Sequence, residues 1–141
     1  MKHLGFLVLA SITLLAAGCG GPDRNALARQ TVQTYWDDVR HAKFKDAYGK
    51  LTSGQQQVNS LGQYARNMFD FLKGTEGVTA IVGNPKVSGD CAKVPVTLKS
   101  PKAPNPKDDL HAYQDLYWQN GGWRISNESG GLTHATTVSC A

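Results

Sequence analysis

The residues of this chain that could transfer protons are few and are spread along the sequence. Asp37 and His41 stand four residues apart, a spacing that would bring their side chains together on one face of a helix. An exposed helix with no catalytic role carries the same spacing equally well. His111 and Asp115 are also four residues apart, but in a predicted strand that distance is ~13 Å, so their side chains cannot touch.

Motifs that would specify a reaction are absent from the sequence. It contains no HExxH pair, no nucleophile elbow and no phosphate-binding glycine loop. We therefore expect no catalysis, and no cofactor or metal. The alternative is an acid–base enzyme that uses an Asp or a His in a pocket.

The N-terminus has the composition of a secretory signal. Lys2 precedes an apolar run of about 14 residues, from Leu4 to Ala17, which is shorter than the ~20 residues of a membrane-spanning helix. Small residues close the run and stand directly before Cys19. A basic start, a short apolar core and small residues at the end are typical of a cleaved targeting segment.

The segment Ala16-Ala17-Gly18-Cys19 resembles the bacterial lipobox, the recognition site of lipoprotein signal peptidase. The resemblance implies a diacylglycerol on the Cys19 sulfur and cleavage after Gly18. Residues 1–18 are then a signal peptide, and residues 19–24 hold the lipidated cysteine and a flexible tether. Two acyl chains make a stable anchor, so the membrane is the expected partner of Cys19, on its extracytoplasmic face (periplasm or cell surface). The alternative is an ordinary secreted protein.

The other two cysteines are an even pair in an oxidising compartment. We expect Cys91 and Cys140 to form a disulfide that closes a loop of about 50 residues, worth roughly 4 kcal/mol in the chain-entropy model. A buried pair of thiols and a metal site are the alternatives. The absence of a CxxC motif argues against the metal.

Beyond the tether, roughly 120 residues are enough for one domain, which we place at residues 25–141. Apolar residues first recur three and four apart, which indicates helices. The predicted helices are Asn25–Ala42 with Asp23 as N-cap, Phe44–Leu51, and Gln55–Leu72, which Gly62 could divide and Lys73-Gly74 would end.

After Gly74 the apolar period changes to two, which indicates strands. Pro95 has no backbone N–H, so its strand should lie at a sheet edge or carry a local irregularity. Helices followed by an antiparallel meander predict an α+β domain with its helices packed on one face of a sheet. The predicted strands are 78–82, 86–88, 94–98, 110–119, 123–126 and a last one within 132–140, with a tight turn at Asn120-Gly121-Gly122.

This order resembles the nuclear transport factor 2-like superfamily, a cone in which a curved antiparallel sheet wraps a long N-terminal helix. The likeness rests on Tyr35-Trp36 followed by Phe44–Tyr48, on the helical segment that reaches Met68-Phe69, and on the hairpin Tyr117–Ile125. It implies the fold, a tendency to dimerise and a tendency to form a pocket. It implies no reaction, because a fold alone does not carry a function.

The candidate binding residues form two groups, both of which contain aromatic side chains. One group either fills the core or lines a cavity at the wide end of the cone, as aromatic side chains do in ligand sites. The other group alternates along one face of the predicted strand 110–119, and that face is either solvated or a partner surface. The pocket candidates are Tyr35, Trp36, Phe69, Trp118 and Trp123, and the interface candidates are His111, Tyr113, Asp115 and Tyr117.

The formal net charge of the whole chain is +4, and the basic residues are scattered, which excludes a nucleic-acid-binding protein. We therefore expect a membrane-anchored domain that binds either a small apolar ligand in the cone or a protein at the sheet face. That protein would be a second copy of this chain or another envelope protein. A structural envelope lipoprotein is a further alternative.

Overall fold

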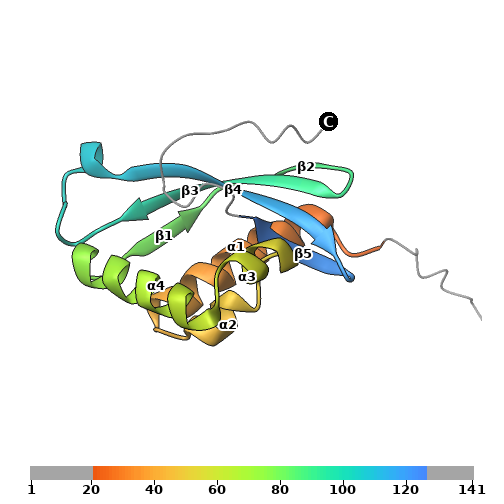
Figure 1. Cartoon of the computed structure of the whole chain (residues 1–141). Coiled ribbons are helices and arrows are strands. Elements are labelled where there is room, and N and C mark those ends of the chain that lie inside the picture. The colour runs from red at the N-terminus through yellow and green to blue at the C-terminus, as the bar shows by residue number, and fades with distance from the viewer. Residues whose placement is uncertain (1–20, 127–141) are drawn as a thin grey trace, which may run out of the picture.

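The computed structural model describes residues 21–126, and Figure 1 shows helices gathered on one face of an antiparallel sheet. The predicted α+β class is confirmed. Cys19, Cys140 and the strand predicted within 132–140 lie outside the described residues. No helix between residues 21 and 126 is long and apolar enough to cross a membrane. The elements are α1 (Arg24–Arg40), α2 (Phe44–Tyr48), α3 (Ser53–Val58), α4 (Leu61–Thr75), β1 (Thr79–Val82), β2 (Lys86–Ser88), β3 (Cys91–Lys99), the 3-10 helix η1 (Pro106–Asp108), β4 (Leu110–Gln119) and β5 (Gly122–Ser126).

The start of α1 follows the prediction, because the Asp23 carboxylate accepts the backbone N–H of Asn25 at 2.9 Å. The division between α3 and α4 lies at Asn59 and Ser60, so the predicted break at Gly62 is wrong. Ser60 caps α4 by accepting a backbone N–H with its hydroxyl oxygen, and Gly62 is accommodated inside the helix.

The predicted stop at Lys73-Gly74 is also wrong, because α4 continues to Thr75. Glu76 then adopts a left-handed conformation (φ 57°) and Gly77 follows with φ 89°. The Gly77 N–H donates to the Leu72 carbonyl at 2.8 Å, which closes the last turn in the usual glycine-terminated manner.

Strand β3 lies inside the sheet, with β1 and β2 on one side and β4 on the other, so the edge position predicted as one alternative for Pro95 is wrong. The other alternative, a local irregularity, is found in the segment between β1 and β2 that lies beside Pro95, whereas β3 itself keeps an unbroken register with β4. There the Gly83 N–H donates to the Pro95 carbonyl at 2.8 Å. A Cβ on Gly83 would lie 2.7 Å from Cγ of the Pro95 ring, so only glycine fits where this segment passes the proline.

The hairpin between β4 and β5 forms as predicted. Asn120 and Gly121 have positive φ angles of 52° and 77°, as a two-residue type I′ turn requires. This turn sets the register that places Trp118 opposite Trp123.

Helix α1 lies across the inner face of the sheet and buries its apolar side there (Figure 1). The chain after α2 covers the free edge of β5, since the Thr52 N–H donates to the Ile125 carbonyl at 2.9 Å and the Ile125 N–H donates to the Lys50 carbonyl at 2.8 Å. Helix α4 packs chiefly against α2 and buries only Tyr64 fully. The other apolar side chains of α4 that face the core, Met68, Phe71 and Leu72, are half-buried.

Candidate functional site

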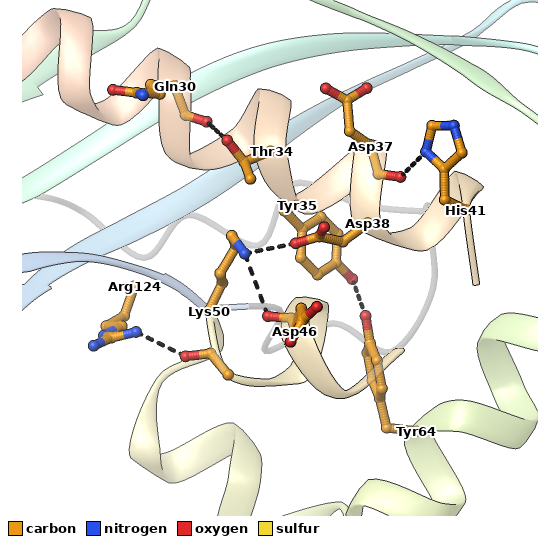
Figure 2. Close-up of polar contacts among 11 residues, drawn as sticks. Gln30, Thr34, Tyr35, Asp37, Asp38, His41, Asp46, Lys50, Tyr64 and Arg124 are labelled. Atoms are coloured by element: carbon orange, nitrogen blue, oxygen red, sulfur yellow. Dashed lines mark hydrogen bonds and ion pairs between the residues drawn. The ribbon is translucent and has the colours of Figure 1, made fainter. Parts of the chain in front are cut away.

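The interior of the fold holds two tyrosine hydroxyls that bond to each other. Tyr64 donates its O–H to the Tyr35 hydroxyl at 3.1 Å, and both side chains are buried (Figure 2). Burial raises the pKa of Tyr64 most, and the nearby Tyr35 and Asp38 raise it further. Tyr64 therefore keeps its proton at neutral pH, and it can act as a hydrogen-bond donor but not as a base.

Trp36 lies next to this pair and carries an unusual group. The residue is only 7% exposed, and its Nε1–H is buried with no hydrogen-bond acceptor among residues 21–126. Its ring meets Tyr35 edge-on at 5.3 Å and lies 6.2 Å from the ring of Phe71 on α4. Buried donors are nearly always paired in native proteins, so this N–H is a candidate contact for a bound acceptor atom.

The five predicted pocket aromatics do not form one group. Tyr35 and Trp36 lie together, whereas Phe69 is 57% exposed on α4. Trp118 and Trp123 meet edge-on at 5.2 Å beside the first residue of α1, about 18 Å along that helix from Trp36.

The two distant tryptophans hold the start of α1. The Trp123 Nε1–H donates to the Arg24 carbonyl at 2.9 Å, and the Arg24 guanidinium lies 4.4 Å from the centre of the Trp118 ring. Arg24 also pairs with Asp90 at 2.9 Å. This arrangement fixes the start of α1 against the β4–β5 hairpin, apart from Trp36 and its neighbours.

The predicted interface residues share the outer face of β4, which points away from α1. Tyr113 is 62% exposed, His111 is exposed, and Asp115 and Tyr117 are half-buried. Lys93 on β3 lies between two of them, with Nζ 3.9 Å from the Asp115 carboxylate and 5.8 Å from the centre of the Tyr113 ring.

The sequence analysis missed a polar cleft between α1, α2 and β5. It is a shallow, open cleft with a volume of about 550 Å³, and Lys50 is one of the residues that line it. The Lys50 ammonium bonds to the buried Asp38 carboxylate at 2.6 Å. No local pattern could have revealed the cleft, because one wall comes from β5, more than 70 residues after the others. The lining residues are Thr34, Asp38, Lys45, Asp46, Gly49, Lys50 and Arg124.

The helical pair expected between Asp37 and His41 does not form through their side chains. Nδ1 of His41 lies 2.7 Å from the backbone carbonyl of Asp37, and the Asp37 carboxylate accepts from Gln33 instead. The His111 ring bonds to the Thr97 hydroxyl at 3.0 Å. In the described part of the chain, no group of three or more His, Cys, Asp or Glu residues could hold a metal ion.

Two solved structures share this architecture. One, from Campylobacter jejuni and provisionally named an NTF2-like transpeptidase, aligns with a TM-score of 0.53 and 11% identity over 70% of this chain and 95% of its own. The other, from Streptomyces avermitilis and provisionally named a dehydratase of the NTF2-like family, aligns with a TM-score of 0.53 and 14% identity over 74% of this chain and 93% of its own. The fold is that of the nuclear transport factor 2-like proteins.

This NTF2-like assignment concerns the fold alone. No protein-family model matches the chain, and no curated protein matches it in sequence. At identities of 11% and 14%, the activities in the two names describe those two proteins and are not assigned to this chain.

Proposed function

We propose that this protein is a lipid-anchored, extracytoplasmic binding domain that holds a small, mainly apolar ligand inside the cone against Trp36. The observation that carries the proposal is the buried Nε1–H of Trp36, which has no hydrogen-bond acceptor among residues 21–126. A ligand that brought an acceptor oxygen to this N–H would remove a desolvation penalty of about 1–3 kcal/mol.

The surroundings of Trp36 define the rest of the ligand. The Phe71 ring lies against the indole, and the apolar side chains of Met68 and Leu72 on the same helix, α4, are half-buried. We expect a ligand with an apolar body and one carbonyl, ether or hydroxyl oxygen.

Binding without catalysis is favoured over the acid–base alternative. Tyr64 keeps its proton, and the carboxylate of Asp38 is already paired with Lys50 at 2.6 Å. Neither group is available as a general base beside Trp36.

The ligand can be sought by mass spectrometry of the full-length protein extracted in mild detergent. We expect additional mass in the native spectrum that disappears on denaturation, and a lower occupancy in Trp36→Phe. Trp118→Phe is the matched control, because Trp118 lies at the other end of α1, and it should keep the ligand. Native spectra without additional mass, before and after incubation with an envelope lipid extract, would contradict the proposal.

The anchor is proposed from the lipobox-like segment before Cys19. Cys19→Ser is expected to move the protein from the membrane fraction to the soluble fraction, and the denatured mass should lack a diacylglycerol. Cys91→Ser leaves the anchor intact and should remain with the membrane. A Cys19→Ser protein that still needs detergent for extraction would point to an uncleaved signal segment instead.

A second candidate function is self-association through the outer face of the sheet. Tyr113 and Ile81 expose 62% and 51% of their surface there, and Lys93 and Asp115 place opposite charges beside them. In a two-fold contact, the lysine of one copy could meet the aspartate of the other. Light scattering of the full-length protein should show a dimer that Tyr113→Glu dissociates and Phe69→Glu, on α4, does not. A monomer at all concentrations would exclude this function.

A further inference from the structure

The cleft defined above carries charge that no ion pair within residues 21–126 neutralises. It contains three cations, Lys45, Lys50 and Arg124, and two carboxylates, Asp38 and Asp46. We infer that this cleft binds a small ligand through one oxyanion group, a carboxylate or a phosphate. This site is separate from the proposed ligand position at Trp36, and the inference does not depend on that proposal.

One of the three cations is already neutralised. The Lys50 ammonium contacts the Asp38 carboxylate at 2.6 Å and also donates to the Asp46 carbonyl at 3.4 Å. The side chains of this pair are 24% and 12% exposed, so the pair is a fixed part of the wall rather than a surface contact. Lys50 therefore contributes hydrogen-bonding capacity to the cleft but little net charge.

Arg124 is held in place but lacks a counter-ion. Its Nη1 donates to the Gly49 carbonyl at 2.7 Å, which fixes the guanidinium beside the cleft (Figure 2). A guanidinium has five N–H groups, so most of them remain available. No carboxylate of residues 21–126 forms an ion pair with Arg124 or with Lys45. A guanidinium oriented in advance matches the two oxygens of a carboxylate or a phosphate, and little entropy is lost on binding.

The remaining charges set the number of negative charges on the ligand. With Lys50 and Asp38 neutralising each other, the other charged lining residues are two cations, Lys45 and Arg124, and one carboxylate, that of the exposed Asp46. The excess is one positive charge, so the cleft favours a ligand with one anionic group over a polyanion. The cleft is shallow and open, so the ligand would be held mainly by its anionic group while the rest of it stays in contact with solvent.

The test is an NMR titration of the full-length protein in non-ionic detergent micelles, with ionic strength held constant by sodium chloride. Inorganic phosphate and acetate are the soluble probes, and bicelles that contain phosphatidylglycerol are the lipid probe. We expect saturable shifts of the amide signals of Lys45, Gly49 and Lys50. Saturation by the soluble probes would identify a soluble ligand, and saturation by the lipid probe alone would identify a headgroup. Both results support an oxyanion site.

Matched variants separate the site from general charge effects. Arg124→Gln should weaken binding at least tenfold, as expected for loss of a charge-assisted hydrogen bond. Lys45→Gln removes a cation without breaking a contact within residues 21–126 and should also weaken binding. Lys102→Gln removes one positive charge from the exposed loop before η1 and should change nothing. Shifts that grow linearly without saturation, or that are equal in Lys45→Gln and Lys102→Gln, would overturn the inference.

Discussion

Because the indole N–H of Trp36 has no acceptor among the described residues, we predict that removing it will stabilise the protein. Replacement of Trp36 by β-(3-benzothienyl)alanine keeps the shape of the ring system and puts a sulfur atom in place of the N–H. Most changes in a buried core destabilise a protein. Here the ligand-free protein should become more stable, because the variant no longer desolvates a donor that has no acceptor among the described residues.

The size of the effect follows from the burial of the group. A buried, unsatisfied donor costs about 1–3 kcal/mol, and Trp36 is only 7% exposed. For a domain of this size, 1 kcal/mol raises Tm by roughly 4–8 °C. Phenylalanine would be a poorer test, because the smaller ring leaves a cavity whose cost could mask the gain.

The assay is urea denaturation of protein that has been unfolded and refolded to remove bound ligand, followed by the fluorescence of the two tryptophans that each variant retains. The matched control is the same replacement at Trp123, whose Nε1–H donates to the Arg24 carbonyl at 2.9 Å. That variant loses a hydrogen bond and should be destabilised by about 0.5–1.5 kcal/mol, so the two replacements should have opposite signs. Equal destabilisation at both positions would mean that Trp36 has an acceptor and would refute the argument for the ligand.

Three further predictions concern the framework of the site. Asp38→Asn should lower the free energy of unfolding by about 1–3 kcal/mol in urea denaturation, because Lys50 is left half-buried without a counter-charge. Adding Lys50→Met should restore most of that free energy. Additive losses in the double variant would contradict this pairing. Burial raises the pKa of Tyr64 above its ordinary value of 10.0, so its contribution to stability is complete below pH 10 and falls as the pH rises further. In Tyr64→Phe, the free energy of unfolding should therefore fall less steeply with pH in the alkaline range. An unchanged slope would contradict this. Gly83→Ala should lower Tm, because its Cβ clashes with the Pro95 ring at a cost of about 1–3 kcal/mol. Gly74→Ala has open space around its Cβ inside α4 and should raise the free energy of unfolding by about 0.5–1 kcal/mol. A change in stability of the same sign in both variants would be inconsistent with the packing.

Features that depend on neighbouring residues were predictable. The capping carboxylate of Asp23, the strand from Leu110 to Gln119 and the turn at Asn120-Gly121 all follow from local chemistry, and the structure confirms each of them. The failures at Gly62 and Gly74 reflect tertiary packing that outweighs a local preference. Glycine inside a helix costs only about 1 kcal/mol, and an amphipathic helix that packs its apolar face against the fold can absorb that cost.

Features that join distant segments were not predictable in this way. The interior position of β3 depends on which strands pair with it, and Pro95 is tolerated there because Gly83, in the segment between β1 and β2, allows a close approach to the proline ring. The periodicity that correctly assigned Trp36 to an apolar face could not show that its N–H lacks an acceptor.

The amino-acid sequence by itself determined the order of the elements and the α+β class, because hydrophobic period, capping and turn chemistry act over a few residues. Only the tertiary structure decided where the candidate sites lie. It joined Arg124 to Gly49 across 75 residues and paired Asp38 with Lys50, and it separated Trp118 and Trp123 from Trp36. Contacts of this kind depend on the packing of a whole domain, in which each buried polar group takes the partner that the surrounding fold provides.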